Sequence, residues 1–240
     1  MERHLEVNAN NITSNVIVVN MVSSKPSRHP AGGNTPQPYH HGDLARALVV
    51  AARRLIEAGG SARLTLRDAA TAAGVSVAAP YRHFADRQAL LAAVLTEGFD
   101  ELAEATETAR RRAPDALGAL RAVGLAYVDF AVRQRAIYRL MFGPECNKAA
   151  YPALLAAGQR ARGVLVQAVQ ACQAAGVVTA AQPADAIALA GWSLCHGLAS
   201  LHADGLLADT LPVPIEAAAE ALVQMLLQGV ALPSPRATAR

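Results

Sequence analysis

The sequence has 240 residues, of which 52% are hydrophobic and 4% aromatic, and its formal net charge at pH 7 is +3. The apolar content is enough to bury a core, and the dominance of alanine favours helices, because strands prefer β-branched and aromatic residues. Three widely spaced cysteines exclude a disulfide framework and a paired-cysteine metal motif. We therefore expect an all-α, cytoplasmic protein of about nine helices without metal or cofactor.

The first 38 residues mix asparagine, serine, glycine and proline with few large apolar groups, which predicts a disordered extension over 1–38. Its one apolar run, residues 16–19, is much too short for the core of a signal peptide, so no export is expected. Met21 is an alternative start of the chain. Later, the segment from Ala186 to Ala203 has no charged residue over about the length that crosses a bilayer. Its serines and histidines favour a helix buried in protein, so no membrane partner is expected.

A first helix is predicted over 43–58, because its apolar residues fall on one face and two glycines follow it. Residues 39–90 carry seven arginines against four acidic residues, whereas residues 91–113 carry five acidic residues against three arginines. The basic part of the chain should therefore be the one that meets phosphate.

Residues 65–84, TLRDAATAAGVSVAAPYRHF, are typical of two short helices joined by a tight turn. Thr65 and Asp68 have the spacing of a helix cap, and Gly74 stands where a left-handed backbone ends the first helix. Ser76 is placed to cap a second helix, on which Tyr81 and Phe84 share a face. A helix-turn-helix sets its second helix into the major groove, so the stretch predicts binding to double-stranded DNA.

The predicted DNA contacts fall into two groups. Phosphate is expected to be met mainly by Thr65, Arg67, Tyr81, Arg82, His83 and Arg87. The bases are expected to face Val77, Ala78 and Ala79, and the predicted site also includes Leu66 and Ser76. Pro80 lacks a donor and is tolerated only in the first turn of a helix, which leaves the start of the second helix open by a residue or two.

The string GVSVAAPYRHFADRQALL, together with the helix before it, resembles the N-terminal domain of the tetracycline-repressor (TetR) family of transcriptional regulators. Pro80 departs from the apolar residue that is usual in the family. The resemblance implies a three-helix DNA-binding domain over 39–86, with its helix-turn-helix at 65–84.

A linker helix, capped by Asp86, is predicted over 87–112, and Pro114 then breaks the chain. The remaining periodic segments predict helices over 115–134, 137–142, 153–175, 183–203 and 215–228. They would form a C-terminal domain over 113–230, followed by a disordered tail over 231–240.

The last two predicted helices alternate small residues with leucines, so they can pack at short distance against each other and against a second copy. A monomer burying them internally is the alternative. The family's dimers form in this way, and the resemblance therefore implies a homodimer.

The segment Trp192-Ser193-Leu194-Cys195-His196-Gly197 resembles the tryptophan-histidine-glycine signature of one type of TetR-family C-terminal domain. Trp192 and His196 stand at i and i+4, on one helix face, which is compatible with the wall of an effector pocket. A buried histidine that ties neighbouring helices together stays open as the alternative. Other large side chains that could line a pocket are Tyr127, Phe130, Tyr138, Met141 and Phe142. Tryptophan in place of Ala190 or Leu194 is expected to fill it.

These patterns favour a ligand-responsive transcriptional regulator, most simply a repressor that binds a palindromic operator as a homodimer and is released by a small, mainly apolar effector. The helix from Asp86 would act as the lever between effector and DNA. The alternatives are a helical dimer or adaptor without an effector, and an enzyme. The enzyme is disfavoured, because the side chains of Cys195 and His196 point about 100° apart on their helix and cannot form a nucleophile-base pair.

Overall fold

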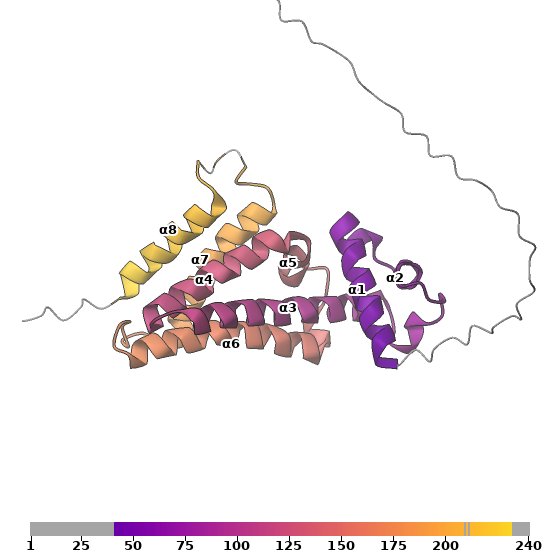
Figure 1. Cartoon of the computed structure of the whole chain (residues 1–240), viewed down its shortest axis with the longest axis horizontal. Coiled ribbons are helices and arrows are strands. Elements are labelled where there is room, and N and C mark those ends of the chain that lie inside the picture. Colours follow the sequence, from indigo (N-terminus) through magenta and orange to yellow (C-terminus); the bar gives the residue numbers. More distant parts are fainter. Residues whose placement is uncertain (1–40, 209, 211, 232–240) are drawn as a thin grey trace, which may run out of the picture. The chain divides into compact units, whose positions relative to one another are not determined.

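The structure is a computed structural model that describes residues 41–208, 210 and 212–231 (Figure 1). The extension predicted for 1–38 and the tail predicted for 231–240, apart from Ala231, lie outside these residues. The described residues contain eight α-helices and, as their only β-structure, an isolated bridge between Val178 and Ala231. The prediction of an all-α protein is therefore confirmed. None of the helices in the described ranges combines the length and the apolarity that crossing a bilayer requires.

The first helices are α1 (His41–Gly59) and α2 (Leu66–Ala72), connected by the 3-10 turn η1 (Ser61–Arg63). The predicted cap of α2 is confirmed, because the Thr65 hydroxyl oxygen accepts a hydrogen bond from the Asp68 backbone N–H at 3.0 Å. The same hydroxyl donates to the Asp68 carboxylate at 2.6 Å. Thr65 and Asp68 therefore fix the start of α2 through two mutual hydrogen bonds.

The second helix of the predicted helix-turn-helix is shorter and tighter than expected. Gly74 has φ +71°, the left-handed conformation that was predicted to end α2. The chain then forms turns as far as η2 (Pro80–Arg82), which is one 3-10 turn rather than an α-helix. The reason lies at Pro80: it has no N–H with which to continue an α-helix, and the Ser76 carbonyl is bonded instead by the Ala79 N–H at 3.0 Å.

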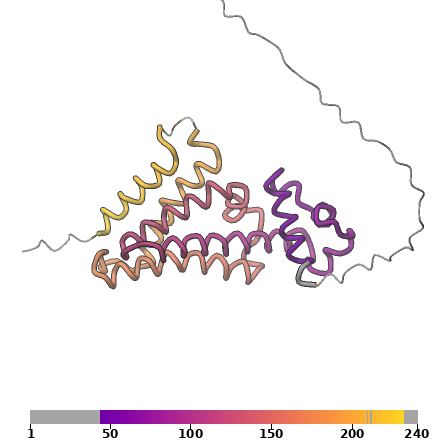
Figure 2. Tube along the Cα trace, in the orientation of Figure 1, coloured from indigo at the N-terminus to yellow at the C-terminus, as the bar shows by residue number. Residues whose placement is uncertain are grey.

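The other helices match the predicted ones to within two residues at either end. They are α3 (Arg87–Arg112), α4 (Ala116–Arg133), α5 (Arg135–Phe142), α6 (Pro152–Ala174), α7 (Ala184–Ala203) and α8 (Ile215–Val230). Carboxylates cap two of these helices: Asp86 accepts from the Ala89 N–H at 2.8 Å, and Asp115 from the Gly118 N–H at 2.7 Å. Figure 2 follows the trace from α1 and α2 through the long α3 into the remaining helices.

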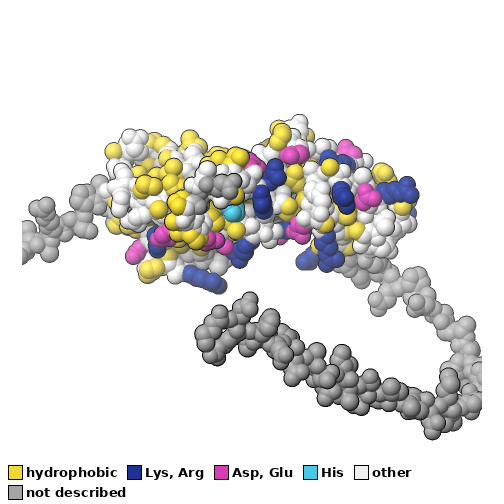
Figure 3. Space-filling view, turned by 90° about the horizontal axis from the view of Figure 1, so that it is seen from above, with side chains coloured by type: hydrophobic (Ala, Val, Ile, Leu, Met, Phe, Trp, Pro, Cys, Tyr) yellow, Lys and Arg dark blue, Asp and Glu magenta, His cyan; other side chains and the backbone are white. Residues whose placement is uncertain are grey.

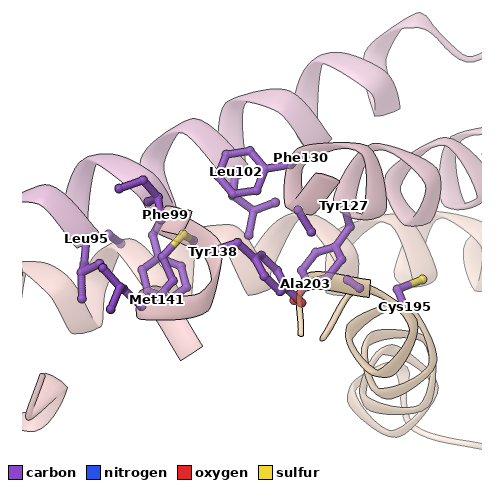
Figure 4. Packing of buried hydrophobic residues seen from close by; sticks show 14 of the residues in the cluster. Leu95, Phe99, Leu102, Tyr127, Phe130, Tyr138, Met141, Cys195 and Ala203 are labelled. Carbon is purple, nitrogen blue, oxygen red and sulfur yellow. The ribbon is translucent and has the colours of Figure 1, made fainter. Parts of the chain in front are cut away.

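Helix α3 runs beside α6 and also packs on α4 and α5 (Figure 1). Side chains from α3, α4 and α5 fill the space between these helices, as Figure 4 shows for Phe99, Leu102, Tyr138 and Met141. The closest approach is at Gly98, where an added Cβ would lie 2.9 Å from Ile137 Cγ2 and 3.0 Å from Met141 Sδ. A side chain at this position would therefore force Ile137 or Met141 to move.

Candidate functional site

Most of the residues predicted to contact DNA lie on an exposed surface formed by the start of α2 and the turns after it. We call it the recognition surface, and it consists of Thr65, Arg67, Ser76, Val77, Ala78, Ala79, Tyr81 and Arg82. All of these are exposed apart from the half-buried Ala79, and the side chains of Val77 and Tyr81 are 46% and 61% exposed. Figure 3 shows several basic side chains on the same part of the molecule, and in residues 41–94 these are all arginines.

Two residues of the predicted DNA site, Leu66 and His83, are less exposed than most of the recognition surface. Leu66 is buried, with 5% of its surface exposed, so its side chain belongs to the core of the α1 and α2 region. His83 is half-buried. Tyr81 and Phe84 do not share a buried face, because Phe84 is buried and Tyr81 is exposed. The expectation that the two side chains share a helix face is therefore not met, since η2 is a 3-10 turn and not an α-helix.

Arg87 was predicted to meet phosphate, but its guanidinium group is bonded within the chain. Its Nε donates to the Leu64 carbonyl at 2.9 Å, and its Nη2 donates to the Ser61 carbonyl at 2.7 Å. The residue stands at the first position of α3 and is half-buried. Arg87 therefore clamps the start of α3 to the loop before α2, a contact that is distant in sequence and has no local signal.

A cavity of about 370 Å³ lies among helices α3 to α8. Four of the predicted pocket residues line it: Tyr127, Met141, Phe142 and Trp192. Phe130, Tyr138 and His196 do not line it. The sequence did not indicate the contributions of α3, α6 and α8 to the wall, among them Phe99, Leu102, Thr106, Ala161 and Val223. A volume of this size falls within the range of about 300–1,000 Å³ that takes a small-molecule ligand.

His196 lies behind the cavity wall, in a hydrogen-bonded cluster with two tyrosines. Its Nδ1 is 2.7 Å from the Tyr138 hydroxyl and 2.9 Å from the Tyr127 hydroxyl, and these hydroxyls are 3.2 Å apart. Trp192 Nε1 donates to the Tyr127 oxygen at 3.2 Å. This polar cluster of Tyr127, Tyr138, Trp192 and His196 joins α4, α5 and α7, as the alternative reading of His196 anticipated.

Donor and acceptor roles in the polar cluster follow from the geometry. If His196 carries its proton on Nε2, which is 3.4 Å from the Ser200 hydroxyl oxygen, Nδ1 is free to accept from Tyr138. Tyr127 then donates to Tyr138 and accepts from Trp192. Burial favours this neutral form, because it lowers the pKa of His196 and raises those of Tyr127 and Tyr138.

The outer faces of α7 and α8 carry large apolar side chains that are exposed. Leu189, Leu194 and Leu201 of α7 are 52%, 38% and 44% exposed, and Met225 of α8 is 57% exposed. Ala190 is exposed beside them and Leu194 does not line the cavity, so the expectation that tryptophan at either position fills the cavity is wrong. Figure 3 shows hydrophobic side chains gathered over these helices.

Arg53 connects α1 with the helices around the cavity. Its guanidinium forms a two-pronged ion pair with Glu101 of α3, with Nη2 2.7 Å from Oε2. Nη2 also donates to the Gln134 side-chain oxygen at 3.1 Å. Gln134 is the residue between α4 and α5, so one side chain of α1 holds both α3 and the start of α5.

Neither metal binding nor a reactive thiol is indicated within the described ranges. No group of three His, Cys, Asp or Glu side chains there is arranged to hold a metal ion. Cys146, Cys172 and Cys195 are all free and buried. Burial raises the pKa of the Cys172 and Cys195 thiols to about 11, which leaves both protonated at neutral pH.

Two family models match the chain. Residues 48–94 match the model described as bacterial regulatory proteins of the tetR family, and residues 120–226 match a tetracyclin repressor-like C-terminal domain. No curated protein matches the sequence.

Several solved structures are similar to the chain. A protein of unknown function from Rhodococcus sp. RHA1 is 38% identical, with a TM-score of 0.73, over 82% of this chain and 100% of the other. A bacterial regulatory protein of the tetR family from Rhodococcus RHA1 is 21% identical, with a TM-score of 0.60, over 79% and 98% of the two chains. The TetR family transcriptional regulator PfmR from Thermus thermophilus is 21% identical, with a TM-score of 0.58, over 75% and 97%.

Proposed function

This chain belongs to the TetR family of transcriptional regulators, whose helix-turn-helix domain binds DNA, and on that premise we propose that it is a ligand-responsive repressor acting as a homodimer on a palindromic operator. In this proposal residues 39–86 bind DNA in the cytoplasm, the helix over 87–112 links the two functions, and residues 113–230 bind the effector and form the dimer. The observation that carries the proposal is that α3 reaches both sites: Arg87 at its start clamps the loop before α2, and Phe99 further along it lines the cavity.

The cavity is the proposed effector site. Its wall is mainly apolar, which supports an effector with a largely apolar body. Trp192 and Tyr127 line the cavity, and their polar atoms are hydrogen-bonded within the polar cluster. The polar cluster therefore makes one side of the cavity wall rigid. His196 then acts as a positioning residue for the wall, without touching the effector.

Effector binding is proposed to reach the DNA through α3 and α5 together. Phe99 of α3 and Met141 and Phe142 of α5 all line the cavity. Both helices are also connected to α1 by Arg53, through Glu101 and Gln134. A ligand shifts such an equilibrium only by its differential affinity for the two states, and typical couplings of about 1–3 kcal/mol change DNA affinity by roughly 5- to 150-fold.

The homodimer is proposed to form through the outer faces of α7 and α8. Ala186, Ala190 and Leu194 of α7 stand at i, i+4 and i+8, and Ala217, Ala221 and Met225 of α8 repeat the spacing, all of them exposed. Two such faces from two copies pack into a four-helix interface, in which the small residues allow close approach. A dimer also matches the two-fold symmetry of a palindromic operator.

A gel shift on the DNA upstream of the chain's own coding sequence tests the DNA-binding part of the proposal, in a series of salt concentrations. The wild-type protein should bind, and Arg67→Ala and Arg82→Ala should each weaken binding to every sequence and reduce the salt dependence by about one phosphate contact. Arg160→Ala on α6, whose side chain pairs with Asp100, is the matched control and should bind like the wild type. An adaptor or an enzyme would give no specific shift, and that result would exclude the regulator on this DNA.

A further inference from the structure

The charged groups on the cavity wall are all positive. The lining side chains include Lys148 and Arg162 but no aspartate or glutamate. Arg162 is already paired, because its Nη2 donates to the Asp185 carboxylate at 2.6 Å. Lys148 has no carboxylate within ion-pair distance among the described residues, whereas several arginines of the chain are paired with carboxylates. Within the described ranges, Lys148 is therefore the cation of the cavity wall that forms no ion pair.

The other polar groups of the wall are satisfied by protein partners. The Thr106 hydroxyl donates to the Leu102 carbonyl at 2.8 Å, and the Trp192 N–H donates to the Tyr127 oxygen at 3.2 Å. Lys148 is half-buried and its Nζ makes one hydrogen bond, to the Gly143 carbonyl at 2.7 Å. An ammonium group has three donors, so two remain for a ligand. The contact with Gly143 also places the ammonium at the end of α5, next to Phe142, whose ring lines the cavity.

We propose that the cavity takes an amphipathic anion, with its apolar body among the aromatic and aliphatic side chains and its acidic head on the Lys148 ammonium. This inference rests on the proposed function, in which the cavity is the effector site. A half-buried ammonium that forms no ion pair gains from a charge-assisted hydrogen bond to an anion. The only other charged group of the wall is Arg162, whose charge is already paired with Asp185. The acidic head is either a carboxylate or a phosphate, since the Lys148 ammonium is a compact charge that binds both kinds of anion.

Trp192 makes the test direct, because it is the only tryptophan of the chain and it lines the cavity. Tryptophan fluorescence of the full chain is titrated with decanoate, with decyl phosphate and with uncharged decyl alcohol as the matched probe. The wild type should bind at least one of the two anions about tenfold more tightly than the alcohol, the size of effect expected of a hydrogen bond to a charged group. The stronger of the two anions identifies the head group.

Lys148→Gln keeps a donor for the Gly143 carbonyl and removes the charge, so it should lose the preference for the anion while binding the alcohol unchanged. Lys148→Arg should keep the preference, and Arg160→Gln, which removes a positive charge from α6 outside the cavity, should leave all three affinities unchanged. If Lys148→Gln unfolds, it will bind no probe, and Lys148→Met is then the variant that removes the charge.

The outcomes separate this inference from the proposed function. Equal affinities for anion and alcohol in the wild type, together with release of DNA by the alcohol, would overturn the anionic effector and leave the effector cavity intact. A preference that survives in Lys148→Gln would also overturn it. If none of the three probes changes the fluorescence or releases DNA, both the anion and the effector role of this cavity fail, while binding of the upstream DNA remains an independent result.

Discussion

The hydroxyl of Tyr138 lies 2.7 Å from Nδ1 of His196. Tyr138 belongs to the short helix α5 and His196 to α7, so this hydrogen bond holds together two helices that are far apart in the sequence. A neutral imidazole protonated on Nε2 can accept this hydrogen bond at Nδ1, and burial favours the neutral form by lowering the pKa of His196.

The first prediction concerns pH. Because the folded pKa of His196 is lowered, the unfolded chain binds a proton at higher pH than the folded one, and the free energy of unfolding should fall as the pH drops below the ordinary value of about 6.5. His196→Gln keeps an acceptor for Tyr138 and should lose this part of the pH dependence. Urea unfolding from about pH 8 to about pH 5 measures it. His202→Gln on the same helix is the control and should keep the wild-type slope.

The second prediction separates two neighbouring arginines. Arg87→Ala should lower the free energy of unfolding by about 2 kcal/mol, because it removes hydrogen bonds from a charged group to the Leu64 and Ser61 carbonyls. Arg82 is exposed on the recognition surface, so Arg82→Ala should change stability by less than about 0.5 kcal/mol. Only Arg82→Ala should reduce the salt dependence of DNA binding. If Arg87→Ala also reduced the salt dependence of DNA binding, Arg87 would contact phosphate after all.

The third prediction concerns assembly. The double variant Leu194→Glu with Met225→Glu places charges on the proposed dimer face and should be monomeric by analytical ultracentrifugation, with weaker DNA binding. Leu155→Glu changes an equally exposed leucine on α6, outside that face, and should leave the dimer intact. If the double variant stays dimeric, the interface lies elsewhere.

The fourth prediction fills the cavity. Ala161 of α6 is half-buried and lines the cavity, so Ala161→Phe should occupy part of the ligand volume. The variant should lose the fluorescence response to decyl alcohol and make DNA binding insensitive to it. Ala171→Phe adds the same ring to an exposed position of α6 outside the cavity and should respond like the wild type. A full response in Ala161→Phe would place the ligand in another site.

The fifth prediction concerns the thiols. All three cysteines are buried and burial raises their pKa values, so iodoacetamide at neutral pH should leave the native protein unmodified. The same reagent should add three groups per chain in urea, as intact-mass measurement will show. Because Cys195 lines the cavity, rapid labelling of this residue alone in the native protein would mean that the reagent reaches the thiol through the cavity.

Much of the fold was predictable because the ends of the helices are determined by capping residues that lie close to them in the sequence. Thr65, Asp86 and Asp115 each accept the backbone N–H three residues ahead, and this spacing is visible in the sequence. The second helix of the motif is shorter and tighter than its pattern indicated, because Pro80 has no N–H with which to continue an α-helix there.

The site was less predictable because it depends on contacts between distant segments. The sequence places Tyr127 and Tyr138 among the large side chains of neighbouring helices, but only the crossing of α4, α5 and α7 decides that Tyr127 lines the cavity and Tyr138 lies behind it. Likewise, the partners of Arg87 are loop carbonyls more than twenty positions earlier, which no periodicity indicates. Lys148 did carry a signal, as the only lysine after Lys25 in a chain that otherwise uses arginine.

The contact at Gly98 has a mechanical consequence for the proposed switch. Because Gly98 has no side chain, Ile137 and Met141 of α5 pack directly on the backbone of α3. This close packing opposes a gradual sliding of one helix along the other. A ligand in the cavity that contacts Phe99 and Met141 would therefore move α3 and α5 together and would not separate the two helices. In the proposed switch the motion would reach α1 through Arg53, which is bonded to Glu101 of α3 and to Gln134 at the start of α5.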